Sequence, residues 1–383
     1  MLAVALPPGP ATVLVVQFHN DSQYPDLNWV GESVAETLMN EMGSANQIVL
    51  DRNARAEGMR RLSLRPDAGF TKATLIRLGQ TLDAGYLCYG SYDAKLADDS
   101  TELKNSSIQV SAHFIDLRKM REGPDFSEAG KLSELSTLEE HLAWESLKYL
   151  QPGVSFQLDR FIAPQKLTRV DAEESYIRGL LSSNSDLRRK WFNQAIALDP
   201  QFSSPAFELG ELALDRKDYP QATTWFQHIP ANDPRYAEAR FKLGLSAYGA
   251  GDFTAAANYF REVVKMFPLS EIYNNLGAAE DQLHLPAAID DFRRALDGNQ
   301  TDSTYLFNLG AALLKNNYFD EAAKRFEAVL DHDPDDADAH TLLDCAQHHE
   351  PAPLDPKTTP SERLKQNFDE TAFRQLKAML QRK

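Results

Sequence analysis

Possible metal ligands gather on one segment near the C-terminus. The segment 336–349 is predicted to be a helix, and its candidate ligands are His340, Asp344, Cys345, His348 and His349. A spacing of four residues places Asp344 beside His348 on one helix face. The same spacing places Cys345 beside His349, so each pair offers two ligands to a metal ion. The rest of the sequence adds no ligands at a suitable spacing, so we expect a solvated helix and no bound metal.

An acidic run just before that helix suggests calcium as a second possibility. Its sequence is Asp331-His332-Asp333-Pro334-Asp335-Asp336-Ala337-Asp338. A calcium loop of the helix-loop-helix type needs a glycine at its sixth position and a glutamate at its twelfth, and both are missing here. Carboxylates are favoured in the first turn of a helix by its dipole. We therefore predict that Asp335 and Asp336 begin the helix and that they bind no calcium.

The remaining motifs of known enzymes are missing from the sequence. It contains no phosphate-binding loop, no dinucleotide glycine fingerprint, no nucleophile elbow and no zinc-protease helix. Cys88 stands inside an apolar run, where we expect a buried and inert thiol. We therefore predict a protein that is not an enzyme and has no cofactor.

Composition narrows the classes of partner. The chain has 383 residues, of which 43% are hydrophobic and 25% charged, and its formal net charge is −16. This charge repels nucleic acid and anionic membrane surfaces, so we expect neither as a partner. No stretch approaches the ~20 apolar residues of a membrane span. If Met1 is the true start, we expect a cytoplasmic protein; if a signal precedes it, a periplasmic one.

A repeat of about 33 residues runs through the second half of the chain. Leu-Gly pairs recur with their glycines 34, 33 and 33 residues apart, at Gly210, Gly244, Gly277 and Gly310. Twelve, sixteen and twenty-four residues after three of these glycines come an alanine, a phenylalanine and a proline: Ala222, Phe226 and Pro234; Ala256, Phe260 and Pro268; Ala322, Phe326 and Pro334. The unit of Gly277 is irregular, with Ala288 and Phe292 one residue early and no closing proline.

Such a repeat predicts stacked helical hairpins. Small residues allow two helices to approach closely, a phenylalanine is expected to fill the seam between one hairpin and its neighbour, and a proline ends the second helix. One hairpin cannot bury its apolar face alone, whereas a stack forms a continuous core. The pattern resembles the tetratricopeptide repeat (TPR). Four units match well, at 203–234, 237–268, 270–301 and 303–334, with an atypical first unit at about 170–200 and half of a sixth at 336–349.

The first 150 residues predict a different fold. Strands are expected at 12–18, 48–50, 86–92, 108–117 and 125–130, and helices at 34–42, 71–82 and 137–150. Strands that alternate with helices indicate an α/β layer domain.

This region resembles the N-terminal domain of TolB. The resemblance rests on Val16-Gln17-Phe18-His19-Asn20-Asp21-Ser22, on Leu27-Asn28-Trp29-Val30-Gly31-Glu32, on Ala84 to Tyr92 and on Ala112 to Leu117. It implies a bacterial protein with a binding or structural domain at this end. The β-propeller of TolB is absent, so the partners of TolB are not carried over.

We therefore predict an α+β multidomain protein. A small N-terminal α/β, TolB N-terminal-like domain (1–150) and a linker (151–169) precede an all-α TPR solenoid of about five to six helical hairpins (170–349). A Pro-rich linker (350–360) then leads to a C-terminal amphipathic helix (361–383) with a charge of +3. We expect this helix to fold back onto the solenoid; the alternative is a helix that docks on a partner or a membrane surface.

The inner curve of the solenoid is the predicted functional site. In tetratricopeptide repeats, positions 2, 5, 9, 12 and 13 of each first helix face it, with Leu-Gly at positions 7 and 8. The resemblance implies the following residues: Phe207, Glu211, Asp215, Glu238, Phe241, Leu245, Tyr248, Asn274, Asp281, Gln282, Phe307 and Lys315. Asn275 and Asn308 stand one position away from this set. Aromatic anchors flanked by carboxylates and amides suit an extended peptide or a helix.

Three functional hypotheses stay open. The first is an adaptor that binds a protein segment in the groove while its α/β domain binds or positions a second partner. The second is an enzyme with an unfamiliar site between the two domains. The third is a structural protein that assembles with copies of itself. In the adaptor hypothesis, the chain's own C-terminal helix competes for Phe207, Phe241 and Phe307.

Overall fold

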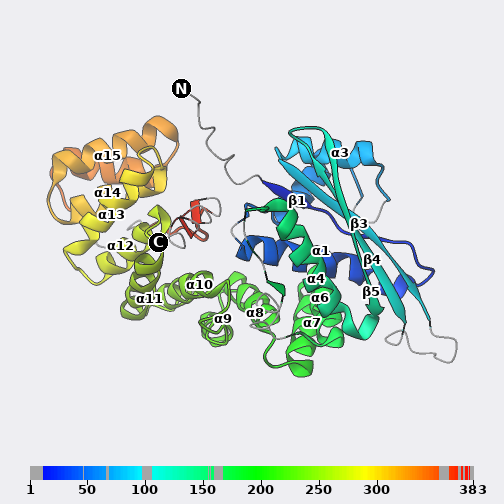
Figure 1. The fold of residues 1–383 in the computed structure, drawn as a ribbon. Helices are drawn as coiled ribbons and strands as arrows, with labels where there is room; N and C mark the ends of the chain where they lie inside the picture. Colours follow the sequence, from blue (N-terminus) through cyan, green and yellow to red (C-terminus); the bar gives the residue numbers. More distant parts are fainter. Residues whose placement is uncertain are drawn as a thin grey trace. The chain divides into compact units, whose positions relative to one another are not determined.

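The chain folds into two compact units, 1–205 and 206–383, in a computed structural model (Figure 1). The structure describes residues 12–45, 47–65, 69–96, 106–153, 155, 157–158, 167–352, 362–369, 372–373, 376–377 and 379. Most of both predicted linkers, 151–169 and 350–360, lies outside these residues. The predicted domain boundaries stay predictions.

The first unit contains a twisted sheet with the strand order β1-β3-β4-β5 (Figure 1). The strands are β1 (Val13–Val15), β3 (Tyr86–Lys95), β4 (Ser107–Asp116) and β5 (Arg121–Lys131). β1 is parallel to β3, while β3, β4 and β5 are antiparallel to one another. The short β2 (His19–Asn20) extends the β1 edge by pairing with β3.

Helices cover both faces of this sheet. The helices of this region are α1 (Trp29–Ser44), α2 (Arg52–Arg61), α3 (Lys72–Thr81) and α4 (Leu135–Leu150). Leu78 of α3 packs against Leu87 and Ile115 on one face. Phe114 points to the other face, where its ring lies 5.3 Å from that of Tyr149 in α4. The sequence prediction of an α/β layer domain therefore holds for this region.

Residues of the TolB-like pattern hold α1 against the sheet. A Cβ on Gly31 would lie 2.0 Å from the carbonyl oxygen of Phe18, so only glycine permits this approach. Glu32 is buried next to Gly31 and forms ion pairs with Arg52 and Arg55. These residues therefore have structural roles in the first unit.

One predicted element of this region needs correction, and one helix was missed. The predicted strand 48–50 is only an isolated bridge between Val49 and Val13. The helix α2 was not predicted, because its sequence, Arg-Asn-Ala-Arg-Ala-Glu-Gly-Met-Arg-Arg, has few apolar residues to show a helical period. Met59 is the residue of α2 that joins the core beside Leu75 and Leu78.

Helical hairpins form the rest of the chain. They run through α6 (Val170–Leu181), α7 (Ser185–Leu198), α8 (Ser203–Asp215), α9 (Tyr219–Phe226), α10 (Tyr236–Gly249), α11 (Phe253–Met266), α12 (Ser270–Gln282), α13 (Ala287–Gly298), α14 (Ser303–Lys315), α15 (Phe319–His332) and α16 (Ala337–Gln347). From α10 onward each helix packs on the next, as a solenoid requires (Figure 1). The first hairpin, α6 and α7, belongs to the compact unit 1–205.

A phenylalanine ring packed on a glycine joins the two helices of each hairpin. In α10 and α11, a Cβ added to Gly244 would lie 2.5 Å from the ring of Phe260. The same contact recurs at the other four hairpins, in the pairs Gly179–Phe192, Gly210–Phe226, Gly277–Phe292 and Gly310–Phe326. The phenylalanine therefore packs within its own hairpin, on the glycine that the sequence pattern repeats.

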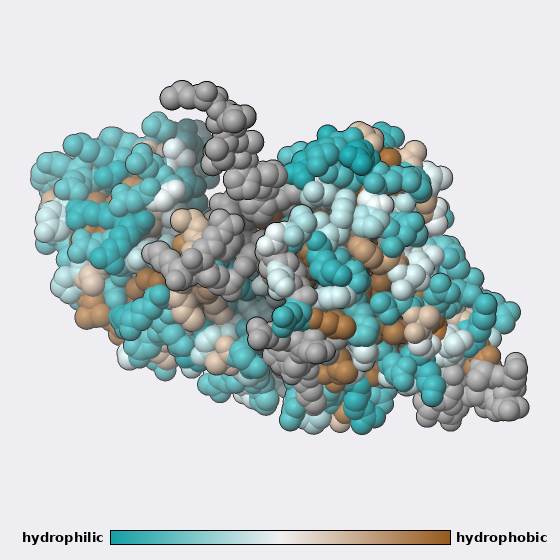
Figure 2. Space-filling view, viewed as in Figure 1, coloured by the Kyte–Doolittle hydropathy of each residue, from teal (hydrophilic) through white to brown (hydrophobic). Residues whose placement is uncertain are grey.

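The C-terminal helix predicted for 361–383 begins later than expected. Residues 362–369 have no helical structure, whereas the described residues 372–373, 376–377 and 379 are helical. The other positions of the predicted helix lie outside the described residues. None of the helices within the described ranges is both long and apolar enough to cross a lipid bilayer. The visible face of each unit is mainly hydrophilic, with apolar side chains in small groups (Figure 2).

The Gly–Phe contact predicts the effect of one added methyl group. Gly244→Ala should lower the free energy of unfolding by about 1–3 kcal/mol, because overpacking forces the Phe260 ring to move. Gly43→Ala is the matched control, since a Cβ there meets no atom within 4 Å. The control should be neutral or more stable by up to about 1 kcal/mol. Urea denaturation measures both changes, and a Gly244→Ala chain as stable as the wild type would contradict this account.

Candidate functional site

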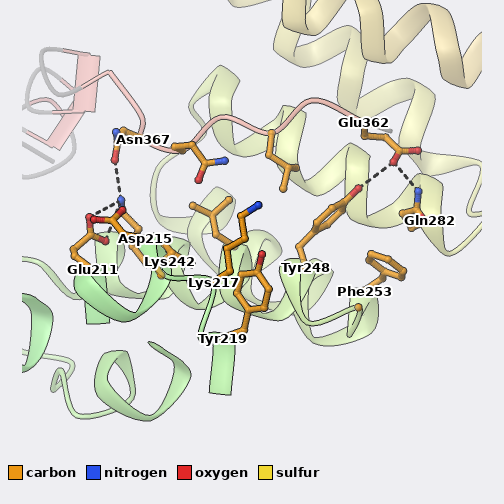
Figure 3. Close-up of a pocket in the computed structure, with 16 residues that line it drawn as sticks. Glu211, Asp215, Lys217, Tyr219, Lys242, Tyr248, Phe253, Gln282, Glu362 and Asn367 are labelled. Atoms are coloured by element: carbon orange, nitrogen blue, oxygen red, sulfur yellow. Dashed lines mark hydrogen bonds and ion pairs between the residues drawn. The ribbon is translucent and has the colours of Figure 1, made fainter. Parts of the chain in front are cut away.

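The inner face of the solenoid carries a second stretch of the same chain. Residues 362–369, here called the C-terminal segment, form no helix or strand, bend at 366–367 and lie across α10, α12 and α14 (Figure 3). All of these residues belong to the unit 206–383. The inner face can therefore be described together with the polypeptide that it contacts.

Two asparagines pair with the backbone of the C-terminal segment. The Asn308 amide donates to the Arg363 carbonyl oxygen at 2.7 Å, and the Arg363 N–H donates back to Asn308 Oδ1 at 2.8 Å. Asn275 repeats this arrangement with Lys365, at 2.8 Å and 2.9 Å. Asn274 adds a further donor to the Arg363 carbonyl oxygen at 3.0 Å. Each asparagine offers one donor and one acceptor, as a neighbouring β-strand would.

The same position of three successive repeats makes these contacts. Asn275 and Asn308 each stand directly before a Leu-Gly pair, and so does Lys242. Lys242 Nζ donates to Asn367 Oδ1 at 2.8 Å and also pairs with Glu211 at 3.1 Å (Figure 3). The segment therefore advances two residues per repeat, in the direction opposite to the order of the repeats.

Glu362 enters a buried polar site at one end of the segment. Its carboxylate accepts hydrogen bonds from Tyr248 Oη at 3.0 Å and from Gln282 Nε2 at 2.6 Å (Figure 3). Lys315 Nζ lies 2.7 Å from the other oxygen of Glu362 and also pairs with Asp281. Three donors therefore satisfy a carboxylate that is only 8% exposed.

Two cations of the segment meet carboxylates that begin helices. Arg363 forms a two-pronged pair with Asp336, the N-cap of α16, at 2.6 and 2.8 Å. Lys365 Nζ lies 2.7 Å from Asp302, the N-cap of α14. Arg363 also stacks its guanidinium 3.5 Å from the centroid of the Phe307 ring. Each of these carboxylates therefore caps a helix and binds the segment.

Apolar side chains anchor the other end. The Phe368 ring packs edge-on against Phe241, with centroids 5.4 Å apart. Phe373 follows, and the centroid of its ring lies 4.6 Å from that of Phe267. Leu364 packs against the apolar core of the solenoid. Backbone, charged and apolar contacts therefore act along the whole segment.

A cavity of about 760 Å³ remains beside the segment. Leu364, Gln366 and Asn367 form one wall, and side chains from the turns and ends of the solenoid helices form the rest, among them Lys217, Tyr219, Leu245, Tyr248 and Phe253 (Figure 3). The segment thus leaves part of the inner face unfilled.

Comparison with known proteins agrees with the repeat pattern. Two sequence models described as tetratricopeptide repeat match residues 241–303 and 284–344. The chain contains tetratricopeptide repeats. Such repeats generally mediate protein–protein interactions and are typically non-catalytic. No curated protein matches the chain.

Three solved structures are similar to part of the chain. YrrB, described as a TPR protein with an unusual peptide-binding site, is 18% identical; the match covers 46% of this chain and 92% of YrrB, with a TM-score of 0.40. MamA from Desulfovibrio magneticus is 19% identical; the match covers 43% of this chain and 95% of MamA, with a TM-score of 0.40. Pseudomonas aeruginosa pilF is 18% identical; the match covers 47% of this chain and 88% of pilF, with a TM-score of 0.39.

The structure places the predicted groove residues of the repeats in three different settings. Nine of them contact the C-terminal segment or line the cavity beside it: Glu211, Asp215, Phe241, Leu245, Tyr248, Asn274, Gln282, Phe307 and Lys315. Asp281 contacts Lys315 at the same site. Phe207 is buried under Arg235, whose guanidinium lies 4.3 Å from its ring centroid, and Glu238 is half-buried.

Sequence reasoning missed the strongest contacts of the inner face. Asn275 and Asn308 fall one position outside the expected set, as does Lys242. Asp336 was expected only to begin a helix, and the sequence analysis did not single out Asp302. A usable signal existed, because a polar residue precedes the Leu-Gly pair in three successive repeats.

The other candidate sites of the sequence remain without a metal centre. Among the described residues, no group of three or more histidine, cysteine, aspartate or glutamate side chains is arranged to hold a metal ion. His348 instead pairs with Asp344 at 3.3 Å, and His349 lies 3.7 Å from Asp320. Cys88 is fully buried, and this burial raises the pKa of its thiol.

A small polar cavity in the first unit gathers several carboxyl groups. It measures about 90 Å³ and lies among α1, α4 and α6. Ser33 donates to Glu173 at 2.6 Å, and Thr37 donates to Glu139 at 2.8 Å. Burial, followed by the charge of Glu173, raises the pKa of Glu139, and burial raises the pKa of Glu140 to about 8. Burial and the neighbouring carboxylates therefore disfavour the charged forms of Glu139 and Glu140.

The pKa values of the two acids beside Lys315, Asp281 and Glu362, are shifted in opposite directions. Burial raises the pKa of Asp281 to about 6. Burial also acts to raise the pKa of Glu362, but the hydrogen bond from Asp281 and the charge of Lys315 lower it to about 2. The two carboxyl groups therefore share one proton below about pH 6.

This shared proton predicts a pH dependence of stability. Because the pKa of Asp281 is raised, this residue adds to the free energy of unfolding. The addition is complete below pH 3.8, the ordinary pKa of the group, and is lost as the pH rises through about 6. The lowered pKa of Glu362 gives a contribution that is present above 4.5 and is lost as pH falls through about 2. We therefore expect the free energy of unfolding of the solenoid to fall between pH 5 and pH 7.5.

Asp281→Asn tests this expectation, because asparagine stays neutral and keeps the shape of the protonated acid. This variant should lose less stability than the wild type over the same pH interval in urea denaturation of the full chain. Asp290→Asn is the control, since Asp290 is exposed on α13. Identical pH profiles for wild type and Asp281→Asn would show that Asp281 does not carry the effect.

Proposed function

We propose that this chain is a non-catalytic protein-interaction protein whose solenoid binds an extended polypeptide on its inner face. In the isolated chain, its own C-terminal segment docks there. The backbone pairing of Asn275 and Asn308 carries this proposal. A polypeptide of any sequence presents the same N–H and C=O groups, so this pairing suits peptide recognition in general.

The buried state of these asparagines strengthens the proposal. Asn274, Asn275 and Asn308 are fully buried once the segment is in place. A buried amide that loses its partner costs roughly 1–3 kcal/mol. The inner face is therefore built to have a polypeptide backbone against it, either from this chain or from a partner.

The first unit supports an adaptor function. We propose that its residues 1–150 form a TolB N-terminal-like domain of a bacterial protein and that this domain binds or positions a second partner. Gly31 and Glu32, which belong to the similar pattern, hold α1 to the sheet. This structural role leaves the outer surfaces of the unit available for binding.

Exchange of backbone hydrogens tests whether the asparagines hold the segment. In the full chain, the double variant Asn275→Ala and Asn308→Ala should increase exchange at the Arg363 and Lys365 amides by roughly 10-fold or more, because each loses its acceptor. Hydrogen–deuterium exchange with mass spectrometry measures this. Asn258→Ala, on the exposed face of α11, should leave the exchange unchanged. Equal exchange in all three proteins would count against the pairing.

Binding in trans tests the function itself. A protease site placed at 355–360 allows the full chain to fold first and the segment to be cut afterwards. After cleavage and dilution, the solenoid should bind a fluorescent peptide of residues 361–383 saturably, as measured by fluorescence polarisation. The same cleaved protein with Asn275→Ala and Asn308→Ala should bind at least about 10-fold more weakly. Absence of saturable binding by the cleaved wild type would refute the proposed function.

A further inference from the structure

We propose that the C-terminal segment is a displaceable occupant and that its side-chain pattern describes the partner. The partner would present an extended segment with an acid, arginine, an apolar residue, a basic residue, two further residues and an aromatic residue, in that order. In this chain the pattern is Glu362-Arg363-Leu364-Lys365-Gln366-Asn367-Phe368. This inference rests on the proposed function and adds which polypeptides the inner face selects.

The first position selects a carboxylate. Glu362 receives hydrogen bonds from Tyr248 and Gln282, and Lys315 pairs with it at 2.7 Å. The site is nearly closed to solvent, so a neutral side chain would leave donors unpaired and a basic one would face the Lys315 ammonium. Selection at this position therefore comes from unpaired groups left behind by the wrong residue.

The second position selects arginine over lysine. The guanidinium of Arg363 binds both oxygens of Asp336 and at the same time lies 3.5 Å from the centroid of the Phe307 ring. A flat, forked cation can satisfy both contacts, whereas an ammonium group offers only a point charge. The Arg363 side chain also lowers the pKa of Asp336 through this hydrogen bond.

The remaining positions extend the pattern along the groove. Lys365 pairs with Asp302 and lies 4.9 Å from the centroid of the Tyr305 ring. Phe368 rests on Phe241. Gln366 is exposed, so the residue at that position carries little selection.

Charge attracts such a partner to this chain. Residues 361–383 carry six basic and three acidic side chains, which gives a net charge of +3. The whole chain has a net charge of −16, so the rest of the chain carries −19. Complementary charge of this kind raises association rates and selects partners. A basic segment that includes one acid at the right place therefore suits this inner face.

The occupancy of the groove by the segment is incomplete, which allows displacement. Asp369 is exposed like Gln366, and the cavity of about 760 Å³ beside Leu364 stays unfilled. A tethered segment competes with an effective concentration of about millimolar for short linkers. A partner with a bulkier apolar residue at the position of Leu364 would gain contacts with Leu245 and Phe253 that the segment does not fully use.

The experiment compares two full-length proteins, the wild type and Arg363→Glu. The substitution lies outside every helix and places a carboxylate next to Asp336, so it should release the segment without affecting the fold. The probe is a fluorescein-labelled peptide of residues 361–374. It should bind the Arg363→Glu protein at least about 10-fold more tightly than the wild type, in which the tethered segment competes. Circular dichroism checks the fold, and hydrogen exchange at residues 362–369 checks the release.

Variant probes test the pattern of side chains. Against the Arg363→Glu protein, probes with Glu362→Lys or Arg363→Glu should bind at least about 10-fold more weakly than the parent probe, since each faces a like charge. A probe with Arg363→Lys should fall between them. A scrambled peptide of the same composition should bind most weakly.

A charge exchange provides the matched rescue. The protein with Arg363→Glu and Lys315→Glu should prefer the Glu362→Lys probe to the parent probe. With that probe, the site again holds two acids and one lysine, as in the wild type, where Asp281, Glu362 and Lys315 meet. Recovery of binding by this pair would show that the acid of the partner is read directly.

The outcomes separate this inference from the proposed function. If all probes, including the scrambled one, bind the Arg363→Glu protein equally, the pattern is wrong while backbone binding stands. If wild type and Arg363→Glu bind the parent probe equally, competition by the segment is wrong. If exchange shows that the segment remains docked in Arg363→Glu, the role of the Arg363–Asp336 pair is wrong. If the segment is released and no probe binds, the proposed function fails as well.

Discussion

A phenylalanine ring packed directly on a glycine backbone sets the spacing within every helical hairpin of this chain. Because the Cβ of any other residue would overlap the ring, the two helices approach at one distance and in one orientation. From α10 onward each helix also packs on the next, so equivalent positions of the first helices recur along the inner face. Lys242, Asn275 and Asn308, each directly before a Leu-Gly pair, contact the C-terminal segment from three successive first helices.

The inner face combines two kinds of recognition. The asparagines form hydrogen bonds with the backbone, which gives affinity for any extended polypeptide. Lys315, Asp336 and Asp302 form ion pairs with charged side chains, and the aromatic residues pack against side chains of matching shape. Two of these acids also cap helices, so the binding surface and the solenoid are stabilised by the same side chains. A polypeptide on this face therefore adds to the stability of the repeats that bind it.

Much of the fold was readable from the sequence because local patterns are strong. Glycine, alanine and phenylalanine at fixed spacing indicated the hairpins, and apolar β-branched runs indicated the sheet. α2 was missed because few of its residues are apolar, so it shows no helical period. Phe241 and Phe307 were expected at the inner face, and the structure places them under Phe368 and Arg363. Asn275 and Asn308 lie one position away from the residues expected at the inner face. The numbering of inward-facing positions taken from the family identifies such side chains only to within one residue.

The sequence by itself determined the number, order and type of the helical units, since these depend on contacts between residues close along the chain. Only the tertiary structure decided the conformation of residues 362–369. Their amphipathic pattern favours a helix, yet Asn275 lies 90 residues from Lys365, and Asn308 lies 55 residues from Arg363. These distant amides take up the N–H and C=O groups that a helix would use internally. No local pattern contains that information, because the competing hydrogen bonds exist only once the hairpins have stacked.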